Sequence, residues 1–179
     1  MKFHSAFSLL TACAMLSPFF AGAQPAAGQN SGQAGAPATI VYRNTQYGFC
    51  FLLPASWQGY TIVAEQWRGE EFSTAQEVHG PQLLIRHPKW TSEHPYQDIP
   101  IMVFTPKQWE QVEKVDISVS AAPIGPAELG HNSHYVFALP PRWIGFYDVK
   151  GIDEVQTLMN QNPFQAPCGH TSTQPVNIP

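Results

Sequence analysis

The sequence has few charged residues, and no long apolar run follows its first part. Of 179 residues, 9 are Lys or Arg and 13 are Asp or Glu, which gives a net charge of −4 at pH 7. Nucleic-acid binding needs clustered Lys and Arg that neutralise phosphates, so this composition argues against it. The later segments are also too short and too polar to span ~30 Å of hydrocarbon. We therefore expect no nucleic-acid partner and no transmembrane segment in the mature chain.

Several catalytic motifs are also absent. No serine lies in the G-x-S-x-G turn of a hydrolase nucleophile. The chain contains no C-x-x-C pair and no H-E-x-x-H zinc motif. Glu70 and Glu71 are neighbouring carboxylates, but Arg68-Gly69 precedes them, and we expect a solvated turn rather than a glycosidase pair. These absences favour a non-catalytic protein over an enzyme, and they predict no cofactor.

The N-terminus has the pattern of a cleavable secretory signal peptide over residues 1–23. Lys2 supplies one positive charge, an apolar core follows, and Ala21-Gly22-Ala23 provides the small residues that signal peptidase requires. The apolar core is short and is interrupted by Ser17 and Pro18, so it does not suit a membrane anchor. We expect an exported protein, periplasmic or secreted, whose mature chain starts at Gln24.

A second cleavage site competes with this one. Leu10-Thr11-Ala12-Cys13 has the form of a bacterial lipobox, in which Cys13 becomes lipidated. The residues after Cys13 stay apolar, whereas a lipid-anchored chain needs a solvated tether at that point. The sequence favours cleavage after Ala23, with a lipoprotein anchored at Cys13 as the alternative.

The mature chain divides into a linker, one domain and a tail. Residues 24–38 contain only Gln, Pro, Ala, Gly, Asn and Ser, a composition typical of a flexible linker. Residues 39–164 form the expected folded domain, and residues 165–179 form an irregular tail rich in Pro and Thr. Short apolar runs between turn residues predict strands at 40–42, 47–53, 59–67, 81–87, 99–105, 117–121 and 134–139.

Two helices are expected. Thr105, Pro106 and Gln108 form a capping arrangement that starts a helix running to about Val115. A second helix is predicted over residues 153–160. Strands without a regular alternation of strand and helix indicate an α+β domain, an antiparallel sheet with helices packed on it.

Cys50 and Cys168 remain in the mature chain. An even pair in an oxidising compartment suggests a disulfide, which would fix the tail to the domain. Alternatively, Cys50, between two phenylalanines, is a small core residue and Cys168 is an unpaired thiol. The sequence leaves both interpretations open, because it does not give the separation of the two Cα atoms.

Several segments carry a family resemblance. Residues 42–57 contain Tyr47-Gly48-Phe49-x-Phe51-x-x-Pro54-x-x-Trp57, and this unit resembles the first hairpin of PsbP-like domains. Residues 86–90, 98–105 and 129–140 are similar to an uncharacterised group of bacterial exported proteins.

The resemblance covers roughly residues 40–163. It implies an α/β/α sandwich around an antiparallel sheet and a cell-envelope setting, but no reaction and no functional residues. Cys50 stands where such sequences more often have a small polar residue, which supports an acquired bridge to Cys168.

Histidines are the strongest hint of catalysis. His131 and His134 flank Asn132-Ser133, and His87 belongs to another segment. A catalytic zinc ion needs about three protein ligands and an open position. If the two segments meet, the three histidines would serve a metal-dependent zinc hydrolase, which is the alternative function.

Aromatic residues give the other lead. The loop after Pro140-Pro141 places Arg142, Trp143, Phe146 and Tyr147 close together in sequence. Exposed, these residues would form a binding surface, because aromatic residues and Arg dominate binding hot spots. Buried, they would cover the core. We expect a non-catalytic envelope module whose partner is an envelope protein, a peptide or a cell-wall component.

Overall fold

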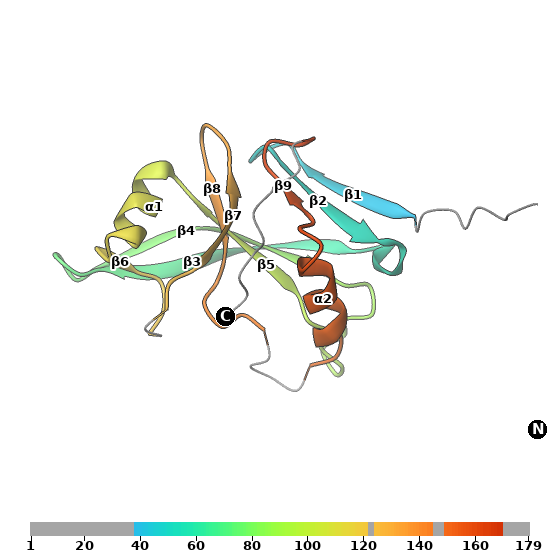
Figure 1. Ribbon diagram of the computed structural model, residues 1–179. Helices are drawn as coiled ribbons and strands as arrows, with labels where there is room; N and C mark the ends of the chain where they lie inside the picture. Colours follow the sequence, from blue (N-terminus) through green and yellow to red (C-terminus); the bar gives the residue numbers. More distant parts are fainter. Residues whose placement is uncertain (1–37, 122–123, 145–148, 170–179) are drawn as a thin grey trace, which may run out of the picture. The chain divides into compact units, whose positions relative to one another are not determined.

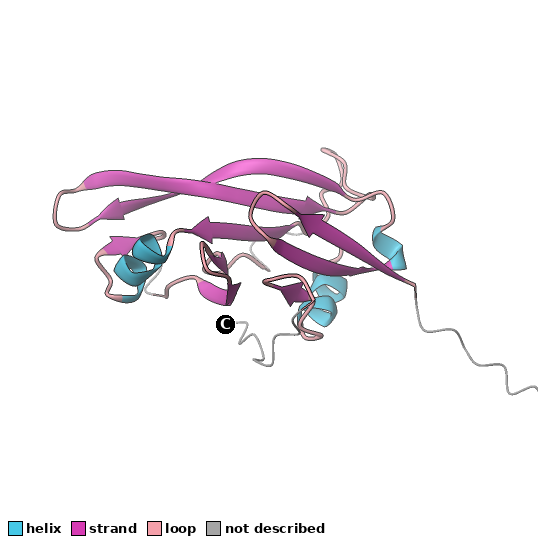
Figure 2. Ribbon diagram, turned by 90° about the horizontal axis from the view of Figure 1, so that it is seen from above, coloured by secondary structure: helices cyan, strands magenta, loops and turns pink. Residues whose placement is uncertain are grey.

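The fold is built on an antiparallel sheet of six strands in the order β6-β3-β4-β5-β8-β7 (Figure 1). The strands are β3 (Thr61–Glu71), β4 (Gln76–Arg86), β5 (Ile99–Phe104), β6 (Ile117–Ser118), β7 (Ala127–His131) and β8 (Val136–Leu139). The computed structural model describes residues 38–121, 124–144 and 149–169. The hairpin of β3 and β4 holds the two longest strands, which lie side by side in Figure 2.

A second antiparallel sheet has the order β1-β2-β9. It combines β1 (Thr39–Asn44) and β2 (Phe49–Pro54) with β9 (Phe164–Gln165). Cys50 lies opposite Gln165, and Phe51 lies opposite Phe164. This small sheet therefore joins strands from the two ends of the described chain. β9 also extends one residue into the segment for which the sequence predicts no regular structure.

Two α-helices and one 3-10 turn complete the fold: α1 (Pro106–Glu113), α2 (Ile152–Met159) and η1 (Ala55–Trp57). The predicted start of α1 is confirmed, because the Thr105 side chain accepts a hydrogen bond from the Gln108 amide and the Gln108 side chain accepts one from the Thr105 amide. In Figure 1, α1 lies beside β6, and α2 lies at the other end of the β3–β4 hairpin.

Two hydrophobic clusters fill the two faces of the large sheet, because successive side chains of a strand point to opposite faces. On β5, Ile101 and Val103 belong to the first cluster, whereas Met102 and Phe104 belong to the second. The first cluster adds the aromatic residues of β2 and three residues of α2, namely Val155, Leu158 and Met159. The second cluster adds Trp67, with Trp109 and Val112 of α1 packed against it.

The predicted class is confirmed: the described residues form one α+β domain with antiparallel sheets. Some boundaries differ. Glu70 and Glu71, expected in a turn, belong to β3, and the turn begins at Phe72. Strand β7 was not predicted, because Pro126 and Gly130 indicate turns. Neither helix in the described part of the chain has the length and apolar character needed to cross a membrane.

Candidate functional site

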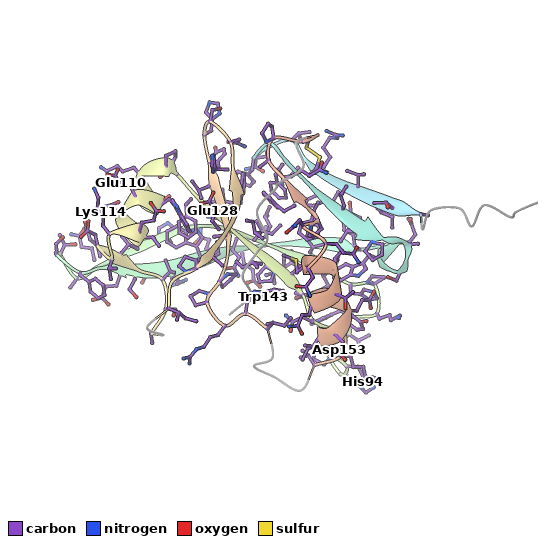
Figure 3. The ribbon with its side chains drawn as sticks, viewed as in Figure 1. His94, Glu110, Lys114, Glu128, Trp143 and Asp153 are labelled. Carbon is purple, nitrogen blue, oxygen red and sulfur yellow. A yellow bond between two sulfur atoms is a disulfide. The ribbon has the colours of Figure 1, made fainter. Side chains whose placement is uncertain are left out.

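A network of hydrogen bonds surrounds Glu154 in the first turn of α2. Ser56 Oγ donates to Glu154 Oε1 at 2.6 Å, and Trp57 Nε1 donates to the same oxygen at 3.2 Å. The Tyr96 hydroxyl donates to Oε2. Asp153 and His94 mark this end of α2 in Figure 3. The network ties η1 and the loop before β5 to α2.

The pKa values in this network follow from its contacts. Burial raises the pKa of Glu154, but the hydrogen bonds from Ser56 and Tyr96 and the nearby positive charge of Lys89 outweigh it, so the net pKa lies below the ordinary value. Burial and the bond to Glu154 raise the pKa of Tyr96 to about 12. A carboxylate with three donors and a lowered pKa is a weak base, so the network suits a structural tie better than proton transfer.

His87 lies beneath this network and is 1% exposed. Its ring stacks on Tyr96 at 4.1 Å between centroids and meets the edge of Trp57 at 4.8 Å. Nδ1 accepts a hydrogen bond from the Lys89 amide at 3.0 Å, whereas the buried Nε2 has no hydrogen-bond partner in the part of the chain that the structure describes. Burial lowers the pKa of His87, which keeps the ring neutral.

The structure does not bring the three histidines of the predicted zinc site together. His131 Nδ1 lies 2.7 Å from Glu128 Oε1, and His134 Nδ1 lies 2.8 Å from Ser133 Oγ. Both are exposed on the β7–β8 hairpin, whereas His87 is buried in the core. Among the described residues, no three His, Cys, Asp or Glu side chains form a group that could hold a metal ion. The zinc-hydrolase alternative has no support from this arrangement.

Cys50 and Cys168 form a disulfide with a Cα–Cα distance of 5.1 Å. This finding decides between the two interpretations that the sequence leaves open. The bond joins β2 to the residues that follow β9, across a sequence separation of 118.

Of the four residues of the predicted aromatic surface, the structure describes Arg142 and Trp143. Trp143 is half-buried and packs against the first cluster. Its buried Nε1 has no partner among the described residues, and its carbonyl oxygen accepts a hydrogen bond from Gln97 at 3.3 Å. Arg142 is exposed. Phe146 and Tyr147 lie outside the described residues. Trp143 therefore contributes mainly to the core, and in Figure 3 it lies well apart from Glu110 and Lys114 on α1.

A hollow of about 430 Å³ lies between α1 and the residues that follow it. Most of its lining is apolar and includes Phe72, Trp109, Val112, Val115, Val119 and Ile124. Phe72 is 59% exposed and Val115 is 66% exposed. Only one other large hydrophobic residue in the described chain is comparably exposed, Val41 on β1. Water therefore reaches two large apolar side chains at the same hollow.

The backbone at Val115 is strained. Val115 has φ 61°, in the left-handed region that glycine usually occupies after a helix. The Asp116 amide donates to the Gln111 carbonyl at 2.8 Å, which closes the end of α1 around this residue. A β-branched residue with positive φ is an outlier, and such strain is concentrated at functional sites. The structure thus holds an exposed apolar side chain at a position that favours glycine.

A second hollow of about 500 Å³ adjoins the first and shares Phe72 and Val119 with it. Its lining includes Arg68, Glu70 and Glu77. Arg68 Nη1 forms an ion pair with Glu77 Oε1 at 3.1 Å, and Arg68 is the only basic residue among the described residues that line the two hollows. With Glu113 in the first hollow, carboxylates outnumber basic groups, and the rim is acidic.

This site was not predicted from the sequence. Two signals were present: Phe72 is a lone aromatic residue in the polar stretch Glu70-Glu71-Phe72-Ser73-Thr74, and Val115 follows a helix where glycine is common. The hollow itself depends on α1 packing beside β6, which no local pattern predicts.

Comparison of this chain with protein-family models, with curated proteins and with solved structures finds no match.

Proposed function

We propose that the protein is an exported, non-catalytic interaction module of the cell envelope that binds a protein or peptide at the hollow between α1 and β6. The observation that carries the proposal is the exposure of Phe72 and Val115 at the mouth of that hollow. When a partner covers apolar surface that is in contact with water, the burial favours binding by about 25 cal/mol for each Å² removed from water. An apolar lining favours a protein or peptide over a polysaccharide of the cell wall.

Two features support an envelope location. The N-terminal residues 1–23 have the pattern of a signal peptide. The disulfide between Cys50 and Cys168 is typical of proteins that fold in an oxidising compartment. The antiparallel sheets with two packed helices are also compatible with the proposed PsbP-like fold.

Site-specific crosslinking tests the interaction. A photoreactive phenylalanine analogue replaces Phe72 in the full chain, and the matched control carries it at Val41, which is exposed on β1. In the producing cells, we expect a discrete adduct from position 72, which is lost when Val115 is also changed to Ser. Adducts of equal yield from both positions would contradict binding at the hollow.

Cell fractionation and N-terminal sequencing test the proposed export. We expect the protein in the extracytoplasmic fraction, with a mature N-terminus at Gln24, and no change in the Cys13→Ala variant. A lipidated N-terminus at Cys13 would show that the alternative cleavage site is used. Recovery of the uncleaved chain from the cytoplasm would contradict export.

A further inference from the structure

We propose that the partner is an extended basic peptide segment that adds as a strand to the open edge of β3 and reaches into the hollow beside β6. This inference rests on the proposed function and specifies the partner and its mode of binding. It follows from three observations: an open strand edge, a hollow at the end of that edge, and an excess of carboxylates along both.

The outer edge of β3 is open over most of its length. On one side, β3 pairs with β4 from Thr61 to Glu71. On the other side, it pairs with β6 only at Glu70 and Glu71, and no other described segment pairs with it. The backbone groups of residues 61–69 on that side therefore have no protein partner in the described chain. An extended peptide binds such an edge through main-chain hydrogen bonds.

The hollow begins where the open edge ends. Arg68 and Gly69, the last unpaired residues of β3, line the second hollow together with Phe72. The glycine at position 69 allows the backbone at Ser118 to approach β3 closely, because a Cβ at Gly69 would lie only 2.6 Å from the Ser118 carbonyl oxygen. A peptide that runs along β3 toward Gly69 therefore reaches the end of the open edge at Ser118 of β6, and there it enters the hollow. Its last apolar side chain would contact Phe72.

Charge indicates which peptide fits. Glu65 is exposed in the middle of the open edge, and Glu70 lies at its end. Arg68 is already paired with Glu77. Glu65 and Glu70 point to opposite faces of β3, so positive charges on one face of the peptide would meet Glu65, which raises the association rate and excludes acidic partners.

The same charges argue against a second copy of this chain. If two β3 edges paired antiparallel about Glu65, the two Glu65 carboxylates would lie close together, and like charges directly opposite one another are destabilising. Natural edge strands use charged residues in this way to prevent edge-to-edge association. The acidic edge therefore excludes a second copy and attracts a basic strand.

Three synthetic nine-residue peptides test the proposal. The first alternates lysine and valine, the second alternates glutamate and valine, and the third has the first sequence with every backbone amide N-methylated. The third peptide keeps charge and side chains but cannot donate to a strand edge. Binding to the mature protein is measured by calorimetry at low salt, and sedimentation gives the oligomeric state.

We expect the lysine peptide to bind, the glutamate peptide not to bind, and N-methylation to weaken binding at least about tenfold through lost hydrogen bonds. Glu65→Lys should weaken binding severalfold through lost charge attraction. Val41→Ser, on the exposed face of β1, should leave binding unchanged, and thermal unfolding verifies that each variant is folded.

The experiment distinguishes a failure of strand addition from a failure of binding at the hollow. If the N-methylated peptide binds as tightly as the parent, strand addition is wrong, although binding at the hollow stands if Phe72→Ser still weakens it. If Phe72→Ser has no effect while N-methylation abolishes binding, the hollow is not the site. A dimer that forms through β3 without peptide would show that a second copy of this chain, and not a basic peptide, binds the edge.

Discussion

Trp67 Nε1, on β3, donates a hydrogen bond at 2.9 Å to the carbonyl oxygen of Val103, two strands away on β5. The indole crosses β4 at Gly80, which is paired with Trp67 in the register. Extending the β4–β5 register by one step would place Val103 opposite Pro81, which has no N–H to donate. The indole therefore supplies a donor where the sheet has none.

Gly80→Ala should disrupt this arrangement. A Cβ at this position would lie 2.6 Å from three atoms of the indole ring, so Trp67 must move away from Phe104 and Val103. We expect a loss of about 1–3 kcal/mol in the free energy of unfolding. Denaturant titration measures it. Gly125→Ala is the matched control, because no atom of the described residues lies within 4 Å of its added Cβ. A loss of equal size in both variants would show that the indole is not the cause.

Acid should destabilise the protein through His87. Burial holds the folded-state pKa of His87 below 6.5, its ordinary value, while Lys89 lowers it further and Glu154 opposes the shift. Stability is therefore fully present above about pH 6.5 and is lost as the pH falls through the folded-state pKa, because the unfolded chain binds the proton more tightly.

His87→Asn isolates this effect. Its side-chain oxygen can still accept the Lys89 amide, but it does not titrate. The free energy of unfolding of the variant should vary less between pH 6.5 and 5 than that of the native protein. Glu154, whose pKa is also lowered, accounts for further loss at lower pH. An unchanged slope in this window would exclude His87 as its origin.

Removing the disulfide should destabilise the domain. Its loop has a sequence separation of 118, for which the loop-entropy model gives about 3–5 kcal/mol. β9 pairs with β2 at only two positions, so few backbone hydrogen bonds replace the lost link. The double variant Cys50→Ser/Cys168→Ser should have a lower midpoint in urea and no response to reductant. If the native protein is also insensitive to reductant, the bond does not contribute to stability.

Val115→Gly should stabilise the fold and weaken binding. Glycine occupies the left-handed region without steric cost, so we expect a gain of up to about 1 kcal/mol in the free energy of unfolding. The same change removes an exposed apolar side chain from the mouth of the hollow. Thermal unfolding and peptide calorimetry measure the two effects. A gain in stability with unchanged affinity would exclude Val115 from the binding surface.

Local patterns predicted the features that depend on adjacent residues. The start of α1 depends on Thr105, Pro106 and Gln108 alone, and the structure confirms it. The hydrophobic run of β5 is likewise buried throughout. These features depend on capping residues and on apolar runs, and both can be recognised in the local sequence.

Features created by distant contacts were not predicted. The outer half of the β3–β4 hairpin pairs Glu70 with Glu77, and its strand character comes from pairing rather than from an apolar pattern. Gly130 indicated a turn, yet it lies in β7 at a register shift, where its backbone has a positive φ of 154°. The hollow beside α1 was missed for the same reason, because its walls come from α1, the turn at Phe72 and the residues after β6.

The β1-β2-β9 sheet has a consequence for the order of folding. Phe49 and Phe51 pack against Phe164, which enters the fold only after nearly all the described residues. Contacts so distant in sequence form late, since the chain between them must first be arranged. If the chain crosses a membrane N-terminus first, as proposed, β2 emerges long before its partner. The main core then closes only after translocation has delivered Phe164, so the segment crossing the membrane remains unfolded until its transit is nearly complete.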